Sequence, residues 1–505
     1  MTRVKEPPTR RAATQRRTAS ASPAQPPVVE RAARRARTTP RPLSVPERRL
    51  RGEAARDALP LEQQGAYEPA PNRRDPVAIL QGQEVSRVPE LVPIRHGRML
   101  VSPFTFYRGA AAVMAADLAA RPVSGITVQL CGDAHVSNFG LFGSPERALL
   151  FDINDFDETH PGPWEWDVKR LVASLAIAGR DNGFGGKERR GIVRACARRY
   201  REAMREFAEQ RELDVWYARL DTDNVQQLVS EPLTKSQIRK VDKLAAKART
   251  RDSMQAFAKL THEVDGHPRI IATPPLVVPI GDLLPEADRA TLITALTGLL
   301  RSYRRTLPSD RRVLLDRYTF IDMARKVVGV GSVGTRCWIV LMEGRDGMDP
   351  LFLQVKEAQP SVLAEHLATG GLPLFRNQGE RVVAGQRLMQ AASDIFLGWQ
   401  SVEGIDGEQR DFYVRQLRDW KGSVDIENTA PKGLSGLGEM CGWTLARAHA
   451  RSGDRIAIAT YLGEDEAFEQ AMVAFADSYA EQNERDYAAL AEAVRTGRVE
   501  AESGI

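Results

Sequence analysis

Two short polar segments carry residue types suited to transferring a phosphoryl group. Residues 131–139 read CGDAHVSNF, and residues 151–158 read FDINDFDE. Each begins at the end of a short apolar run, so Asp133, Asn138 and Asp155 can converge where two strands end. One carboxylate can orient or deprotonate an acceptor hydroxyl, while an asparagine and a second aspartate are hard oxygen ligands for Mg²⁺ on the phosphates of ATP. We therefore expect Asp133 to be catalytic and Asn138 and Asp155 to bind the metal. The wider acidic cluster assigned to this site is Asp133, Asp152, Asp155, Asp157 and Glu158.

A glycine-rich stretch later in the chain offers a second place for phosphates. Residues 329–334 read GVGSVG, a G-x-G-x-x-G spacing. A dinucleotide-binding turn of this spacing needs a helix directly after it and an acidic residue about 20 positions on. Residues 337–342 instead read as a strand, and the residue 22 positions beyond Gly334 is Lys356. This order is that of kinases, in which loop N–H groups cover the phosphates and the lysine pairs with the α/β-phosphates. The expected nucleotide contacts are Gly329, Gly331, Ser332, Gly334 and Lys356.

Two further positions complete the expected nucleotide site. A helix carrying a carboxylate should hold Lys356, and Glu380 is the choice, with Glu365 and Glu357 as rivals. The strand expected at 412–417 would form a hinge whose backbone binds adenine, which assigns Gln416 and Leu417 to the nucleotide. An ordinary strand-to-turn connection explains that stretch equally well.

The elements that must position these residues can be read from the apolar pattern. A helix is expected at 109–120, followed by strands at 126–130 and 148–151. Beyond Asp167, apolar residues recur at the i, i+3, i+4, i+7 spacing of a buried helix face. Residues 186–300 read as mostly helical with a Pro-rich interruption, and β-branched stretches begin near residue 326. A helix at 380–398 and C-terminal helices follow. The C-terminal stripe consists of Phe468, Met472, Phe475 and Tyr479.

The polar segments resemble a known superfamily. The stretch C-G-D-A-H-x-x-N, followed by N-D-F-D, is similar to the catalytic and metal-binding loops of the aminoglycoside phosphotransferase and choline kinase branch of the protein kinase-like superfamily. Cys131 stands where that branch has its first histidine. Trp166-Asp167-Val168 resembles the helix start whose aspartate braces the catalytic loop. The resemblance implies ATP and Mg²⁺ as cofactors.

The order of the motifs differs from that of ordinary kinases. Kinases run from glycine loop to lysine, helix, hinge and catalytic loop, whereas here the catalytic loop comes first. Residues 445–450 (LARAHA) resemble the helix that precedes the catalytic loop in the phosphotransferases. Closely spaced termini tolerate circular permutation, which explains the order economically. The motifs SPFTFYRG, CGDAHVSNFG, NDFDE, KVVGVGSVGT and GQR together resemble the bacterial domain of unknown function 2252 family over about residues 85–505.

The expected fold is therefore α+β, a protein kinase-like two-lobed fold in circularly permuted order. Residues 1–75 are expected to be a disordered basic arm rich in Pro and Arg, and 85–325 a helical lobe with the catalytic and metal-binding loops. Residues 326–425 would form a β-rich nucleotide-binding lobe, and 426–505 helices that pack on the helical lobe.

Charge is distributed unevenly along the 505 residues. The formal net charge is +5, but residues 1–58 carry +10 and the remainder −5. Nucleic-acid binding is thus expected only weakly, through the basic arm. No apolar run approaches the roughly 18 residues that cross a membrane. Four distant cysteines without a C-x-x-C pair suit a reducing cytoplasm.

The function expected from these motifs is an ATP- and Mg²⁺-dependent phosphotransferase. A G-D pair replaces the R-D of protein kinases, which favours the hydroxyl of a small molecule over a protein as acceptor. The first alternative is a non-catalytic nucleotide-binding module, a pseudokinase. A metallophosphoesterase would share the G-D-x-H stretch but needs a G-N-H that the chain lacks.

Overall fold

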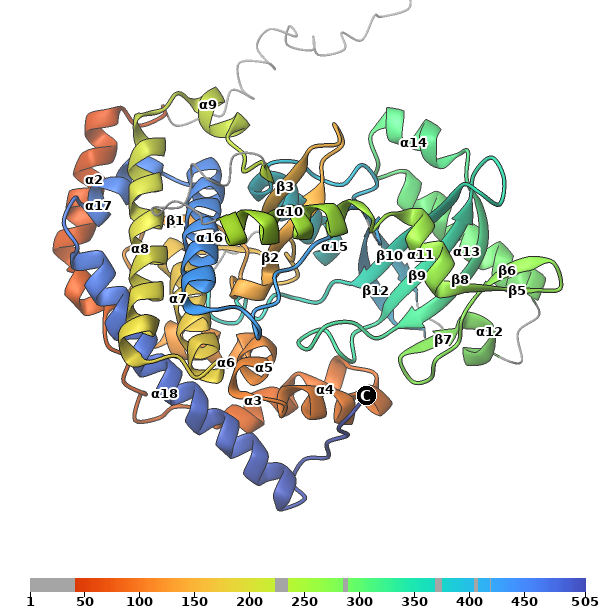
Figure 1. The fold of residues 1–505 in the computed structure, drawn as a ribbon, viewed down its shortest axis with the longest axis horizontal. Helices are drawn as coiled ribbons and strands as arrows, with labels where there is room; N and C mark the ends of the chain where they lie inside the picture. Colours follow the sequence, from red (N-terminus) through yellow and green to blue (C-terminus); the bar gives the residue numbers. More distant parts are fainter. Residues whose placement is uncertain (1–40, 223–234, 285–288, 368–374, 404–406, 418) are drawn as a thin grey trace, which may run out of the picture. The chain divides into compact units, whose positions relative to one another are not determined.

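A helical group and an antiparallel sheet make up most of the described chain in this computed structural model (Figure 1). The structure describes residues 41–222, 235–284, 289–367, 375–403, 407–417 and 419–505. Contacts within the chain group Val45–Ile505 into one unit. The predicted α+β class is confirmed. No described helix is long and apolar enough to cross a membrane.

The helices run in chain order as follows: α2 (Val45–Ala58), α3 (Pro76–Gly82), α4 (Val92–Met99), α5 (Pro103–Gly109), α6 (Ala111–Ala119), α7 (Trp164–Asp181), α8 (Gly186–Glu209), α9 (Glu212–Tyr217), α10 (Lys235–Arg249), α11 (Ser253–Leu260), α12 (Ile280–Leu283), α13 (Arg289–Arg304), α14 (Ser309–Leu315), α15 (Gln378–Met389), α16 (Pro431–Ser452), α17 (Arg455–Leu462) and α18 (Ala467–Arg495). The strands are β1 (Thr127–Leu130), β2 (Phe139–Gly143), β3 (Leu149–Ile153), β4 (His160–Pro163), β5 (Thr261–Val264), β6 (His267–Ile270), β7 (Val277–Pro279), β8 (Thr319–Lys326), β9 (Cys337–Glu343), β10 (Pro350–Glu357), β11 (Gly398–Glu403) and β12 (Gln409–Gln416).

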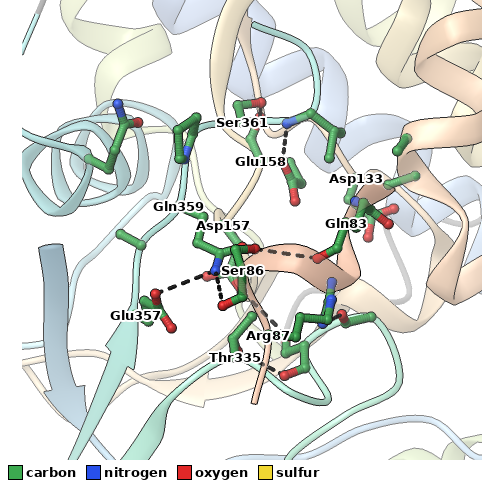
Figure 2. A pocket seen from close by; sticks show the side chains of 18 of the residues that line it. Gln83, Ser86, Arg87, Asp133, Asp157, Glu158, Thr335, Glu357, Gln359 and Ser361 are labelled. Atoms are coloured by element: carbon green, nitrogen blue, oxygen red, sulfur yellow. Dashed lines mark hydrogen bonds between the residues drawn. The ribbon is translucent and has the colours of Figure 1, made fainter. Parts of the chain in front are cut away.

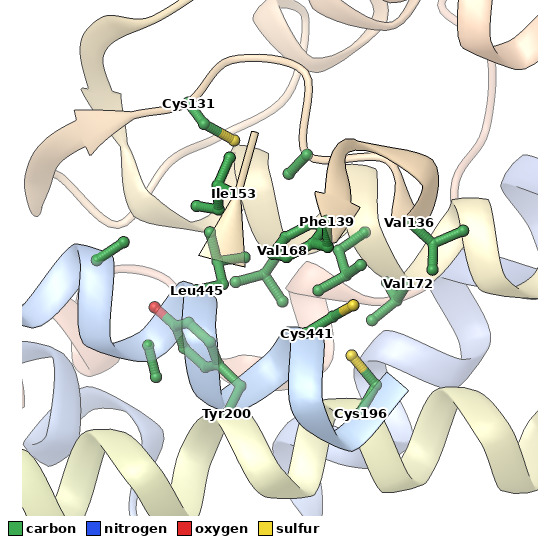
Figure 3. Packing of buried hydrophobic residues seen from close by; sticks show 14 of the residues in the cluster. Cys131, Val136, Phe139, Ile153, Val168, Val172, Cys196, Tyr200, Cys441 and Leu445 are labelled. Atoms are coloured by element: carbon green, nitrogen blue, oxygen red, sulfur yellow. The ribbon is translucent and has the colours of Figure 1, made fainter. Parts of the chain in front are cut away.

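The helical core forms around α7, α8, α16 and α18. Helix α16 lies along α8, and α18 packs on both α7 and α8 (Figure 1). The predicted inward face of α7 is confirmed, since Val168, Leu171, Val172 and Leu175 are all at most 1% exposed. Val168 and Val172 meet Cys441 and Leu445 of α16 beneath Phe139 (Figure 3). The predicted apolar stripe of α18 is buried as well.

Two small sheets hold the polar segments at the edge of this core. Strand β1 pairs with β4, and β2 pairs with β3, both antiparallel. Residues 131–138 connect β1 to β2, and residues 154–159 connect β3 to β4. The two connections therefore leave neighbouring strand ends and lie against each other.

The larger sheet has the order β11-β12-β10-β9-β8-β7 with antiparallel neighbours. Side chains of β10 alternate between two buried clusters. Leu351, Leu353 and Val355 pack toward α13, and Phe352 packs with α11 on the other face. Because side chains alternate along a strand, Lys356 lies on the same face as Phe352. It is opposite Tyr413 of β12 in the pairing register.

The expectation of a disordered arm at 1–75 is wrong for its second half, where α2 and Arg73 pack on the rest of the chain. Helix α2 packs on α17, and a Cβ at Gly52 would lie 2.4 Å from the carbonyl oxygen of Ala457. The Arg73 guanidinium forms ion pairs of 2.6 Å with both Asp117 and Asp486. Helix α2 buries only small residues, so it shows no apolar stripe in the sequence. Residues 1–40 of the expected arm, which carry much of its basic charge, lie outside the described residues.

The expected boundary at residue 326 also differs from the structure. Strands β7 and β8 belong to the larger sheet although both begin before residue 326, and the β5-β6 hairpin interrupts a region expected to be helical. Strands β5, β6 and β7 are short and two of them contain proline, so their alternation is weak. Helix α15 ends at Met389, well short of the expected residue 398, because the chain becomes extended at Gln390.

Candidate functional site

A cavity of about 770 Å³ lies between the glycine loop and the two polar segments (Figure 2). Its wall includes the expected catalytic and metal-binding residues Asp133, Asn138 and Asp155. It also includes Gly329, Gly331 and Ser332 of the glycine loop. Residues separated by about 200 positions in the chain thus face one space.

The loop that carries Asp133 is held by backbone contacts. Gly132 has a φ of +85°, and a Cβ there would lie 2.0 Å from the carbonyl oxygen of Glu158, so only glycine fits. The carboxylate of Asp167 accepts the N–H groups of Cys131 at 2.8 Å and of Gly132 at 3.0 Å. The bracing role expected for Asp167 is confirmed by these two bonds.

The Asp133 carboxylate is bonded to Arg170, and Arg108 acts on it from farther away. The Nε of Arg170 donates to its Oδ1 at 2.8 Å, and Arg170 is held in turn over the Tyr107 ring at 3.9 Å. Burial raises the pKa of Asp133, and this outweighs the opposing effect of Arg170. The Nε2 of His135 lies 3.7 Å from Oδ2, and burial keeps the pKa of His135 well below its ordinary value. At neutral pH a neutral histidine therefore stands beside Asp133.

The expected metal ligands present oxygen atoms to the same space. The Nδ2 of Asn138 donates to the carbonyl oxygen of Asp133 at 2.8 Å, which fixes the amide and leaves its Oδ1 as a potential ligand. Burial and the neighbouring Asp157 raise the pKa of Asp155. The described residues hold no group of three or more His, Cys, Asp and Glu side chains that could bind a metal ion. Two oxygen-bearing side chains nevertheless fit Mg²⁺, which is commonly bound by one or two carboxylates together with substrate phosphates.

Lys356 lies between two carboxylates of the second polar segment. Its Nζ is 2.5 Å from Asp157 and 3.7 Å from Asp155, and the side chain is 3% exposed. The hydroxyl of Tyr413 donates to the other oxygen of Asp157 at 2.6 Å. Burial lowers the pKa of Lys356, but the two carboxylates outweigh burial and raise it well above its ordinary value.

The glycine loop lies close to this cluster and is held by residues from the N-terminal part of the chain. Arg87 donates to the carbonyl oxygen of Gly331 at 2.9 Å, and Arg98 donates to that of Gly329 at 2.7 Å. The expected loop residue Gly334 accepts the N–H of Val88 at 2.8 Å. The Oγ of Ser332 is 3.4 Å from Asp157.

Two features of this loop bear on phosphate binding. The N–H groups of Gly331 and Ser332 donate to no residue that the structure describes. Strand β9 directly follows the loop, so the helix that a dinucleotide-binding turn requires is missing.

The expected partner of Lys356 is wrong. Glu380 lies in the first turn of α15, where its carboxylate accepts the N–H of Arg376 at 2.8 Å. This is a helix-capping contact, which suits an acidic residue at a helix N-terminus. The rivals are engaged elsewhere, since Glu357 pairs with Arg336 at 3.4 Å and Glu365 with Arg74 at 3.8 Å.

The expected adenine contacts are not brought to the cavity. The N–H of Gln416 donates to Asp394 at 2.5 Å, and that of Leu417 donates to the carbonyl oxygen of Phe352 at 2.9 Å. Neither residue is among those that line the cavity. The ladder with β10 uses the N–H of Leu417, and the Asp394 carboxylate uses that of Gln416, so neither N–H is left for adenine.

Asp152 does not join the acidic cluster of the cavity. It is 1% exposed, and the guanidinium of Arg447 in α16 lies 2.5 Å from its carboxylate. Its other oxygen accepts the N–H of Ala391 at 2.8 Å. Alternation along β3 explains this, because Asp152 lies within the strand whereas Asp155 follows it.

Three contributors were not identified from the sequence. Tyr413 and Arg170 reach the carboxylates from distant elements. Arg381 of α15 donates to the carbonyl oxygens of Asp157 and Thr159 at 2.9 and 2.6 Å, and so holds the second polar segment. None of the three lies in a recognisable motif. Asp167 and Arg170 do share a face of α7, a spacing that could have suggested Arg170.

Comparison with known proteins places the chain in a family. A family model described as an uncharacterized protein conserved in bacteria (DUF2252) matches residues 87–493. This match spans most of the chain, so the chain belongs to that family, as its motifs predicted. No curated protein and no solved structure matches it.

Proposed function

We propose that this chain is an ATP- and Mg²⁺-dependent phosphotransferase that phosphorylates a hydroxyl of a small molecule. The observation that carries the proposal is the cavity, which has the glycine loop on one side and Asp133, Asn138 and Asp155 on the other. Phosphoryl transfer depends mainly on positioning and on charge stabilisation, and these are the groups it requires.

The order of elements supports a permuted kinase-like fold. From β8 onward the chain runs strand, glycine loop, strand, strand with Lys356, helix, strand and strand. Helix α16 then contacts β1 and β3, the strands that carry the polar segments. Its His449 lies 3.3 Å from Asp167, so α16 braces the catalytic loop as a helix preceding that loop would.

In the proposed phosphoryl transfer, each of these residues has a separate role. Asp133 orients the acceptor hydroxyl and takes its proton, and its raised pKa favours that transfer. Asn138 and Asp155 hold Mg²⁺, which when bound neutralises charge on the phosphates. The free N–H groups of Gly331 and Ser332 cover the phosphates. Lys356 pairs with the phosphates on one side and with Asp157 on the other.

The test is ATP turnover across a panel of hydroxyl compounds. Asp133→Asn is expected to lower kcat by about 10²–10⁴-fold, the usual contribution of a general base. Asp155→Asn should raise the Mg²⁺ concentration needed for half-maximal rate. Glu365→Gln is the matched control, because its carboxylate borders the same cavity but is 72% exposed. Wild-type turnover that survives Asp133→Asn unchanged would overturn the assignment.

One observation favours the second candidate, a non-catalytic nucleotide-binding module. Lys356 and Ser332 both contact Asp157, so the loop and lysine already have a partner inside the chain. Thermal-shift titration with ATP, with and without Mg²⁺, separates the two functions when combined with the turnover assay. Binding without turnover across the panel would favour the module.

A further inference from the structure

Three arginines line the cavity on the side of α3, α4 and α5. They are Arg87, Arg95 and Arg108. No ion pair joins any of them to a carboxylate of the described residues, although Arg170 nearby is paired with Asp133. Carboxylates act on them only at longer range: Glu84 on Arg87 and Arg95, and Asp133 on Arg108. A buried charge is normally paired at close range, so three neighbouring arginines without such a partner need an explanation.

Of the three arginines, Arg95 gives the strongest evidence for an anion site. Its side chain is fully buried, with 0% exposure. One guanidinium nitrogen, Nη2, donates to Gln83 at 2.8 Å and to the carbonyl oxygen of Gly109 at 3.2 Å. The other two nitrogens, Nε and Nη1, are buried and have no hydrogen-bond partner. Two donors of a buried cation are thus left without a partner in a residue that borders the cavity.

Arg87 and Arg108 extend the same basic surface. Arg87 is 7% exposed, and its Nε has no partner although its Nη1 holds the glycine loop. The Nε of Arg108 is likewise buried without a partner. Burial lowers the pKa of all three guanidinium groups, and in Arg95 the positive charge of Arg87 adds to this effect. The arrangement is unfavourable until an anion enters.

Arg87 holds the glycine loop, and the Arg108 carbonyl oxygen lies beside Gly331 of that loop. The side chains of Arg95 and Arg108 nevertheless favour the acceptor over the nucleotide. The free loop amides and Lys356 already provide for nucleotide phosphates. Arg108 instead acts electrostatically on Asp133, and Arg95 bonds the residue that follows Arg108. An anion held there would stand beside the carboxylate that orients the hydroxyl.

We infer that Arg95 and Arg108, with Arg87, form a subsite for an oxyanion, a phosphate or carboxylate group carried by the acceptor. Guanidinium groups match both oxyanions through paired N–H donors. The inference rests on the proposed function, since it names the class of acceptor as a hydroxyl compound that already bears a negative charge.

The test measures oxyanion binding by calorimetry at constant ionic strength. The probes are inorganic phosphate, glycerol 3-phosphate, glycerate and glycerol, each with and without a saturating non-hydrolysable ATP analogue and Mg²⁺. We expect glycerol not to bind. We expect phosphate to bind in both conditions, and Arg95→Gln and Arg108→Gln each to weaken it by about tenfold or more. A preference for glycerol 3-phosphate over glycerate assigns a phosphate group, and the reverse assigns a carboxylate.

Arg74→Gln is the matched control. Arg74 borders the same cavity but is 59% exposed and lies 3.8 Å from Glu365. Its loss should change phosphate affinity by less than about twofold, because exposed charges are screened. Arg108 is only partly buried, so Arg108→Gln decides the question if Arg95→Gln does not fold.

Each outcome bears on the inference. Unchanged phosphate affinity in Arg108→Gln overturns it, and so does loss of phosphate binding when the ATP analogue is present. Phosphate binding that needs both arginines supports it, even if the analogue never binds, in which case the proposed function fails alone. Analogue binding without binding of phosphate, glycerol 3-phosphate or glycerate overturns the subsite and leaves the proposed function standing.

Discussion

Lys356 contacts two carboxylates of the cavity wall, and these three side chains balance one another's charge. Asp155 and Asp157 are two positions apart, and their side chains are 31% and 27% exposed. Their mutual repulsion is offset by Lys356 and by the hydroxyl of Tyr413. Lys356 is the cation in closest contact with the two carboxylates, and Arg415 acts on them from farther away.

Removing that lysine should destabilise the fold. Lys356→Met removes the cation nearest to two neighbouring carboxylates and leaves only the more distant Arg415. We expect a loss of about 2 kcal/mol at pH 8, below the ~3–5 kcal/mol of a fully buried pair. The double variant K356M/D157N should recover about half of it, because the repulsion is then gone. Chemical unfolding measures both. A double variant no more stable than K356M would show that the loss comes from packing rather than from charge.

Glu158 should make stability depend on pH. Burial raises its pKa from 4.5 to about 7, although Arg381 and the N–H of Val362 oppose this effect. Asp133 and Asp157 raise it further, and Arg87 also faces the group. A raised carboxyl pKa favours the folded state below pH 4.5, and this contribution is lost as the pH rises through 7.

Comparing wild type with Glu158→Gln at two pH values tests whether Glu158 makes the protein less stable as the pH rises. Without metal, in the presence of a chelator, the variant and wild type should be equally stable at pH 4.5. At pH 8.5 the variant should be more stable by about 1 kcal/mol, less than the full shift implies because the side chain is partly exposed. Glu365→Gln is the matched control, because its carboxylate borders the same cavity but is 72% exposed. A stability gap that does not change with pH would contradict the prediction.

Residue types and spacing predict part of the site. Asp133, Asn138 and Asp155 follow strands whose pairing brings their loops together, and alternation turns Lys356 toward them. The partner of Lys356 could not be found this way, because it lies 199 positions earlier in the chain. Arg95 shows the same difficulty, since nothing in its neighbourhood in the sequence reveals that it lacks a counter-ion.

At the scale of elements, the close approach of α16 to α8 positions the loop that carries Asp133. A Cβ at Gly442 would lie 2.5 Å from the carbonyl oxygen of Cys196. Through this contact α16 presents Arg447 to Asp152 and His449 to Asp167. Apolar spacing predicted the buried face of α7, but it does not show which glycine lets two helices approach.

Two glycine substitutions distinguish packing from helix propensity. Gly442→Ala should destabilise by about 1–3 kcal/mol, because the added methyl group meets backbone that cannot move freely. Gly191→Ala on α8 is the matched control, since a Cβ there has nothing within 4 Å. It should stabilise by about 0.5–1 kcal/mol through helix propensity. Thermal or chemical unfolding measures both, and a neutral Gly442→Ala would contradict the close contact.

At the scale of the whole described chain, segments from both ends meet at the glycine loop. The C-terminal tail contacts α4, with the N–H of Glu502 donating to Pro93 at 2.9 Å and His96 bonding the carbonyl oxygen of Glu500 at 2.7 Å. Ile505 packs with a cluster that includes Val333 of the loop. Local patterns could not predict this arrangement, because each segment is short and polar and finds its partners hundreds of residues away.

A substitution in α4 tests whether the tail supports the loop. At Gly97 a Cβ would lie 1.8 Å from the carbonyl oxygen of Glu502, so Gly97→Ala should displace the tail without shortening the chain. We expect hydrogen exchange of the hydrogen-bonded amides of Val333 and Thr335, at the end of the loop, to accelerate by about tenfold, which corresponds to about 1.4 kcal/mol of lost protection. Amides of β9 and β10 should be unaffected, because their ladder does not involve the tail. Gly82→Ala is the control, since a Cβ there has nothing within 4 Å although the residue borders the same cavity. Deleting residues 500–505 should reproduce the effect of Gly97→Ala. If the loop stays protected in both variants, Arg87 and Arg98 hold it without help from the tail.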